Sequence, residues 1–142
     1  MKKLLFSLVI MSLLIFLTAG SAYAQTSVKA DIPFAFTVSG KSLLAGSYTV
    51  SQYGTAIQAL LIQELKNPEG QAYVLTSAVE TDPGKPLEQP RLVFRRYGEQ
   101  YFLGQVWMGA GNTTGRAVEK SAKERQVAKN SPQPELIYVA AK

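Results

Sequence analysis

Five side chains between Arg91 and Met108 have types and spacing that suit the binding of a partner. They are two cations and three aromatic residues, Arg95, Arg96, Tyr97, Tyr101 and Trp107. Exposed aromatic rings stack on sugar rings, and neighbouring guanidinium groups hold carboxylate or phosphate groups through paired hydrogen bonds. A structural interpretation competes with this one: Tyr101 and Trp107 are core residues, and the stems of Arg95 and Arg96 cover sheet edges.

Carboxylate chemistry is a second possibility. Four acidic residues fall at expected strand or loop positions, Asp31, Glu80, Asp82 and Glu99. A glycosidase needs two carboxyl groups about 5 to 10 Å apart across a cleft, and the sequence does not place any two of these four together. A calcium site at Glu80 and Asp82 lacks the usual Asp-x-Asp-x-Asp-Gly pattern. Solvated surface acids explain all four, so we predict neither a catalytic pair nor a metal site.

The chain contains no His and no Cys. This excludes a Ser-His-Asp triad, a Cys-His nucleophile, disulfide bonds and an ordinary zinc site. The Gly-rich segment from Gly109 to Gly115 lacks the Gly-Lys-Ser/Thr ending of a phosphate loop. We expect no cofactor, and we do not expect an enzyme.

The five candidate binding residues lie on two β-rich runs joined by the polar turn from Tyr97 to Gln100. Both faces of the second run carry apolar bulk, so we expect a central hairpin that is covered on both faces. In the first run, alternation places Leu92 and Phe94 on one face and Arg91, Val93, Arg95 and Tyr97 on the other. In the second run it places Tyr101, Leu103, Gln105 and Trp107 on one face and Phe102, Gly104, Val106 and Met108 on the other.

Other segments supply the rest of a sheet. Strict apolar alternation predicts a strand over residues 28–38, at an edge or broken at Pro33, because proline has no amide hydrogen. Gly46 suggests a bulge or a positive φ before a strand over 47–53. A second hairpin, a loop and a last strand are expected over 56–79, 80–90 and 135–140. Ser121 and Glu124 fit the capping box of a short helix, residues 122–129, that should be mostly solvated.

The predicted fold is therefore mostly β. It is a small antiparallel sandwich or barrel of about seven or eight strands with one short C-terminal helix. A barrel of this size could hold one small apolar ligand or fill its interior with side chains, and the pattern leaves this open.

The N-terminus carries a three-part pattern typical of a secretory signal peptide. It consists of Met1-Lys2-Lys3, an apolar run from Leu4 to Leu17, and Ala22-Tyr23-Ala24. The apolar run of about 14 residues is short for a membrane span, although an uncleaved anchor is the alternative. We expect residues 1–24 to be removed, leaving 25–142 as a single domain in the periplasm or outside the cell, with no stable membrane span.

The charge of the mature chain is mild. The full chain carries +5, and loss of Lys2 and Lys3 lowers this to +3. A small positive charge permits contact with anionic glycans or membrane surfaces. The cations are spread along the chain, however, which argues against a nucleic-acid face.

Five segments in order give the chain a resemblance to a group of uncharacterised exported bacterial proteins. They are Asp31-Ile-Pro-Phe-Ala-Phe36, Leu44-Ala-Gly-Ser-Tyr48, Leu92-Val-Phe-Arg-Arg-Tyr-Gly98, Tyr101-Phe-Leu103 and the helix from Lys120 to Arg125. Proteins of this group are similar in their Ile-Pro-Phe first strand and Phe-x-Arg-Tyr-Gly hairpin. The resemblance covers nearly all of the mature chain and implies no activity and no site residues.

Together these features predict an exported, non-catalytic binding or interaction module. Its expected partner is an envelope glycan or a protein. The alternative is a carrier of a small apolar ligand in a β cavity, and a carboxylate-dependent hydrolase is the third candidate.

Overall fold

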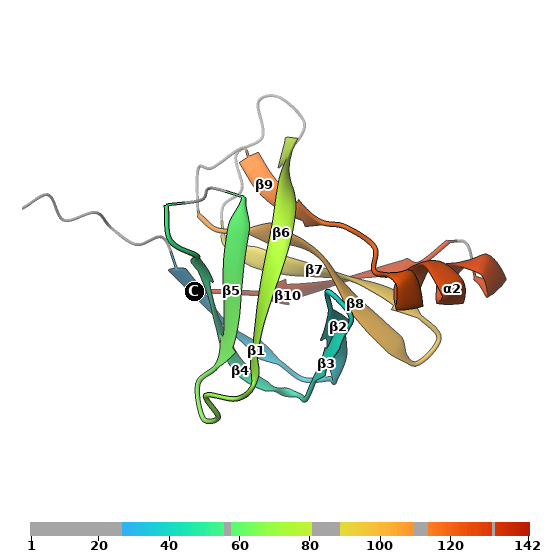
Figure 1. Ribbon diagram of the computed structural model, residues 1–142, viewed down its shortest axis with the longest axis horizontal. Helices are drawn as coiled ribbons and strands as arrows, with labels where there is room; N and C mark the ends of the chain where they lie inside the picture. The colour runs from blue at the N-terminus through green and yellow to red at the C-terminus, as the bar shows by residue number, and fades with distance from the viewer. Residues whose placement is uncertain (1–26, 56–57, 81–88, 110–113, 132) are drawn as a thin grey trace, which may run out of the picture.

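A computed structural model describes residues 27–55, 58–80, 89–109, 114–131 and 133–142. The predicted signal peptide, Asp82 and most of the loop over 80–90 lie outside the described residues. Within these ranges the chain forms ten strands and one helix (Figure 1). They are β1 (Ser27–Ile32), β2 (Phe36–Val38), β3 (Lys41–Leu43), β4 (Gly46–Gln52), β5 (Ala59–Glu64), β6 (Gln71–Glu80), β7 (Arg91–Tyr97), β8 (Gln100–Trp107), β9 (Thr114–Val118), α2 (Ala122–Asn130) and β10 (Glu135–Ala140).

The first predicted strand is broken at Pro33, which is one of the two outcomes that we expected for it. β1 ends at Ile32, and β2 begins at Phe36. Side chains in β1 are alternately exposed and buried, which confirms its one-sided pattern. β2 and β3 form a hairpin through Ser39 and Gly40, whose φ angles of 48° and 82° suit a two-residue turn of the primed type.

The predicted second hairpin is confirmed as β5 and β6. Its turn is closed by the Gly70 amide, which donates to the Asn67 carbonyl at 3.0 Å. The Asn67 side chain accepts from the Glu69 amide. Gly46 does not have the positive φ that was one of the two expectations for it: it opens β4 in regular register, opposite Ile32.

The strands form two layers that share β6. Residues 71–75 of β6 pair with β5, and residues 76–80 pair with β9. β1, β4 and β5 therefore belong to one layer, and β7, β8, β9 and β10 belong to the other. In Figure 1, β5 and β6 lie in front of β7 and β10 and cross them.

The sheet does not close into a full barrel. β1 and the C-terminal segment meet only at the bridge between Ala30 and Ala141, where Lys29 and Lys142 exchange two backbone hydrogen bonds of 2.9 Å. The prediction of a mostly β sandwich or barrel with one C-terminal helix is confirmed, and the open sheet favours the sandwich. The strands number more than predicted because Pro33 divides the first and because β3 and β9 were not predicted.

One hydrophobic core lies between the layers. Phe36, Tyr48 and Phe94 meet edge to face at its centre, with ring centroids 5.2 and 5.3 Å apart. Its other large buried members are Val28, Ile32, Val38, Leu43, Val50, Leu60, Ile62, Val74, Leu92, Leu103, Val106, Val118 and Val139. The predicted orientation of Leu92 and Phe94 towards this core is confirmed.

A β-bulge in β8 corrects the predicted faces of the second run of the central hairpin. Val93 pairs with Gln105 but Phe94 pairs with Leu103, so Gly104 is the extra residue. The bulge shifts the alternation by one residue. Tyr101, Leu103, Val106 and Met108 consequently contact the core, while Phe102 and Trp107 are buried outside this core cluster. The hairpin is apolar and covered on both faces, as predicted.

The predicted capped helix is present as α2. Ser121 is its N-cap and accepts a hydrogen bond from the Glu124 amide at 3.2 Å. Seen in Figure 1, α2 lies at one end of the molecule beyond β8. Across the part of the chain that the structure describes, no helix is long and apolar enough to cross a membrane.

Candidate functional site

The five sequence-predicted binding residues separate into an inner and an outer group. Tyr97 and Trp107 are only 4% and 3% exposed, and Arg95 is largely covered. This corrects the expectation that these three side chains are available to a partner. Arg96 and Tyr101 remain at the surface, where the Arg96 guanidinium lies 5.5 Å from the centre of the Tyr101 ring.

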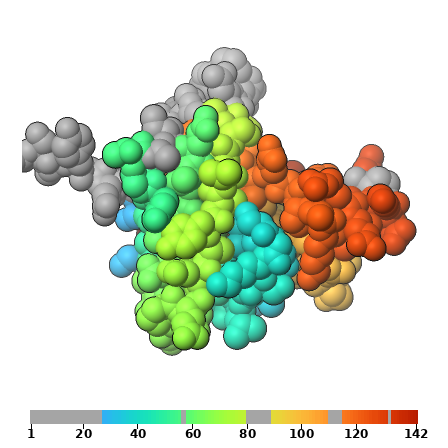
Figure 2. Space-filling view, viewed as in Figure 1, coloured from blue at the N-terminus to red at the C-terminus, as the bar shows by residue number. Residues whose placement is uncertain are grey.

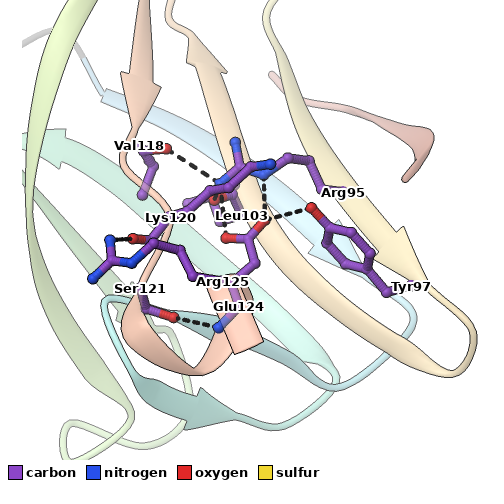
Figure 3. A network of polar contacts seen from close by, with 8 residues as sticks. All are labelled: Arg95, Tyr97, Leu103, Val118, Lys120, Ser121, Glu124 and Arg125. Atoms are coloured by element: carbon purple, nitrogen blue, oxygen red, sulfur yellow. Dashed lines mark hydrogen bonds and ion pairs between the residues drawn. The ribbon is translucent and has the colours of Figure 1, made fainter. Parts of the chain in front are cut away.

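Arg95 is held by a buried carboxylate on α2 (Figure 3). Its Nε and Nη2 donate to the two oxygens of Glu124 at 2.5 and 2.9 Å, and Nη2 also donates to the Val118 carbonyl at 3.2 Å. The Tyr97 hydroxyl donates to the same carboxylate at 3.3 Å. This paired geometry is the strong form of an arginine–carboxylate contact, and it joins β7 and β9 to the helix.

The bulge at Gly104 gives Arg95 its path to Glu124. A Cβ atom at position 104 would lie 2.8 Å from Nη1 of Arg95 and 3.2 Å from the Val93 carbonyl oxygen. A larger residue there would displace the arginine. Glu124 is 2% exposed and is the buried residue of the helix, which is otherwise mostly solvated as predicted. The capping motif marked Glu124 in the sequence, but nothing in the spacing indicated its partner.

Trp107 packs flat against the backbone of β9. A Cβ atom on Gly115 would lie 2.7 Å from three atoms of the indole. The guanidinium of Arg91 lies 6.0 Å from the centre of the Trp107 ring and 5.2 Å from that of Tyr138. Trp107 is thus buried between β9 and the guanidinium of Arg91, which agrees with the structural interpretation in its burial, although Trp107 lies outside the core cluster.

Arg96 and Tyr101 lie near the turn of the central hairpin, beside two shallow depressions. One, of about 320 Å³, is bordered by Arg96, Ser131 and Glu135. The other, of about 230 Å³, is bordered by Leu43, Tyr101 and Lys123. Both open to solvent, so neither is the enclosed apolar cavity that a carrier requires.

Both residues of this outer group already contact other side chains of the protein. Arg96 donates to Glu135 at 3.3 Å and lies 3.7 Å from Glu99, so its charge is balanced by two carboxylates. Tyr101 stacks on Phe34 with ring centroids 3.9 Å apart. An incoming anion would have to displace Glu135, which makes this turn a poor anion site.

The predicted carboxylates show no catalytic pairing among those that the structure describes. Asp31 accepts a hydrogen bond from the Ser47 hydroxyl at 2.5 Å on β1, whereas Glu99 lies at the hairpin turn. The Glu80 side chain and Asp82 lie outside the described part. Within the described ranges no three His, Cys, Asp or Glu residues gather where they could hold a metal ion.

Among the described residues, the most exposed pair of contacting aromatic rings lies elsewhere, on the outer face of β4, β5 and β6. Tyr53 and Tyr73 are 51% and 52% exposed, and their rings meet edge to face with centroids 4.8 Å apart. Leu75 is 76% exposed beside them, and Leu61 is half-buried opposite Tyr73. We call this surface the Tyr53–Tyr73 face, formed by Tyr53, Ala59, Leu61, Tyr73 and Leu75.

Strand register arranges the Tyr53–Tyr73 face in rows. Leu61 pairs with Tyr73, and Ala59 pairs with Leu75, so apolar side chains of two strands lie directly opposite one another. The next row towards the β5–β6 turn is polar and uncharged, with Thr49, Gln63 and Gln71 in register. Figure 2 shows β5 and β6, in green, forming the front of the molecule.

The sequence itself carries a signal for this face. Tyr73 and Leu75 are apolar, and they alternate with the buried Ala72 and Val74, so β6 is apolar on both sides. The same signal predicted cover on both faces of the central hairpin. In β6 the second apolar face is left open to solvent.

Comparison with known proteins adds no relative: no family model, no curated protein and no solved structure matches the chain.

Proposed function

We propose that this protein is an exported, non-catalytic binding module of the cell envelope, and that the Tyr53–Tyr73 face is its binding surface. The observation that carries the proposal is the pair of half-exposed tyrosines beside the largely exposed Leu75. Isolated exposed apolar residues are ordinary on soluble proteins, but contiguous ones mark contact surfaces. The N-terminal signal pattern supports export.

The position of this face suits a preformed binding surface. Its residues stand on β5 and β6, or directly after β4, and the inner sides of these strands carry the buried core residues Val50, Leu60, Ile62 and Val74. The core therefore holds the strands in place, and little ordering is needed when a partner binds. Tyrosine adds large contact area with few rotatable bonds and a hydroxyl group for hydrogen bonding.

A non-catalytic role agrees with the contacts of three described acids. Glu124 is paired with Arg95, Glu135 with Arg96, and Asp31 with Ser47. None of these contacts forms a pair of carboxyl groups, which supports the binding module over a hydrolase.

Co-sedimentation with cell envelope tests the proposal. The full-length precursor is expressed in a bacterium, and the exported chain is purified from the periplasm and weighed intact. It is then mixed with isolated envelope and centrifuged. We expect a chain beginning at Gln25 that pellets with the envelope, and we expect Tyr73→Ala to remain in the supernatant.

Two control variants make this result specific. Tyr138→Ala removes a tyrosine that is 57% exposed on β10, and it should pellet normally. The double variant Arg96→Ala/Tyr101→Ala alters the outer group of the hairpin and should also pellet. Loss of binding in that variant but not in Tyr73→Ala would return the site to the hairpin and overturn the proposed surface.

A further inference from the structure

We infer that the ligand of the Tyr53–Tyr73 face is an extended, uncharged polysaccharide. This inference rests on the proposed function, because it names the ligand class of the same surface.

The charge of the face is the first argument. The side chains that β4, β5 and β6 direct outward are hydroxyl, amide, aliphatic or tyrosyl groups throughout the described residues. They are Ser47, Thr49, Ser51, Ala59, Leu61, Gln63, Gln71, Tyr73, Leu75, Ser77 and Val79. Charged side chains border these rows at their edges: Lys29 and Asp31 on β1 pair with Thr49 and Ser47, and Lys41 Nζ donates to the Gln71 carbonyl at 2.6 Å. Over the apolar rows a charged ligand would be desolvated without meeting an opposite charge, and an uncharged ligand does not carry this additional cost.

The second argument is the alternation of apolar and polar rows. Rows two residues apart along a strand are separated by roughly 7 Å, and paired strands by roughly 4.8 Å. A sugar ring offers the same combination over similar distances: apolar C–H groups on its faces and hydroxyl groups at its edge. Tyr73 and Leu75 can contact the faces of such rings, while Gln63 and Gln71 provide amide donors and acceptors for the hydroxyl groups.

The third argument is the shape of the surface. The outward side chains of three paired strands lie in register across β4, β5 and β6, so the surface extends along the strands. An open surface suits a chain that lies across it, with several sugar units sharing the contact. A single small sugar would bury too little area to offset its loss of motion.

Affinity electrophoresis with matched polymers tests this ligand class. The exported chain is run at about physiological ionic strength through gels that contain hydroxyethyl cellulose, a mixed-linkage β-glucan, a galactomannan or dextran. Carboxymethyl cellulose serves as the charged counterpart of hydroxyethyl cellulose, because the two share one backbone. We expect at least one uncharged polymer to retard the protein. Tyr73→Ala should weaken that binding about tenfold, and Tyr138→Ala should leave it unchanged.

Three outcomes would overturn the inference. Retardation by carboxymethyl cellulose alone would show binding driven by charge. Absence of retardation by every uncharged polymer would exclude these glycans as ligands. A dimer detected by light scattering that Tyr73→Ala dissolves, without retardation by glycans, would assign the face to a second copy of the chain. In that last case the co-sedimentation experiment decides the proposed function separately: the function stands only if the exported chain still pellets with the envelope and Tyr73→Ala does not.

Discussion

The buried ion pair between Arg95 and Glu124 joins the helix α2 to the strands β7 and β9. The carboxylate of Glu124 is 2% exposed and receives hydrogen bonds from Arg95 and Tyr97. Removing one partner of such a pair leaves an uncompensated charge in the interior, which costs more than the pair itself contributes. The sequence identified Glu124 through its capping motif and Arg95 as a candidate ligand-binding cation. Their contact could not be predicted because it joins positions 29 residues apart through a bulge.

Arg95→Ala should therefore lower the free energy of unfolding by about 3–5 kcal/mol. Urea denaturation followed by circular dichroism measures this change. Arg96→Ala is the matched control, since its partners Glu99 and Glu135 are exposed, and it should cost at most about 1 kcal/mol. The double variant Arg95→Met/Glu124→Met should recover most of the loss, because no charge is then left unpaired. Equal effects of the two single arginine variants would contradict a structural role of Arg95.

Tyr48 gives the protein a sensitivity to alkali. Its burial raises the pKa of its hydroxyl above the usual value of 10.0, and the Glu64 carboxylate adds to this rise. The hydroxyl donates to the Leu44 carbonyl at 2.7 Å, so the folded protein favours the neutral form. Its contribution to stability is complete below pH 10 and is lost as the pH rises through the raised value, because the unfolded chain ionises first.

Tyr48→Phe should flatten this part of the stability profile. Free energies of unfolding from denaturant titrations at pH 8 to 11 should fall less steeply for the variant than for the parent protein. The variant should be about 1 kcal/mol less stable at pH 8, since the Leu44 carbonyl loses its donor. Tyr138→Phe, at an exposed position, should follow the parent profile. An unchanged slope in Tyr48→Phe would assign the alkaline loss to other groups.

At the scale of elements, glycines in β8 and β9 allow the central hairpin to be covered on its second side. Gly104 creates the bulge that admits Arg95, and Gly115 lets the Trp107 ring lie against the backbone. Alternation predicted both runs of this hairpin, but it assigned the faces of β8 incorrectly because one extra residue reverses every later side chain. β9 was not predicted because Gly and Arg interrupt its apolar pattern.

Gly115→Ala should destabilise the protein by about 1–3 kcal/mol, because a methyl group there overlaps the indole of Trp107. Trp107 is the sole tryptophan of the chain, so its fluorescence spectrum reports the disturbance directly. Gly109→Ala provides the control, since a Cβ atom there would meet no atom within 4 Å. Similar stability and an unshifted emission maximum in both variants would show that the ring can move aside.

At the scale of the whole molecule, local pattern predicted the class of fold better than it predicted the site. Period-two alternation and turn residues depend on neighbours in the chain, so most strands and the capped helix could be placed from the sequence. The exposure of a side chain depends on which strands cover one another, and this is set by contacts between residues that are distant in the sequence. The Tyr53–Tyr73 face and the burial of Tyr97 and Trp107 both arise in this way, so neither followed from the spacing of residues.

The bridge between Ala30 and Ala141 has a consequence for how the chain is made. β1 is among the first described segments to be synthesised. The backbone of Lys29 can form its two hydrogen bonds with Lys142 only after Lys142 has been synthesised. Until then one edge of β1 has unpaired amide and carbonyl groups that could pair with another molecule. A ribosome that stalls before residue 141 would therefore release a product with an open edge. Such fragments should aggregate more readily than a chain that includes Lys142.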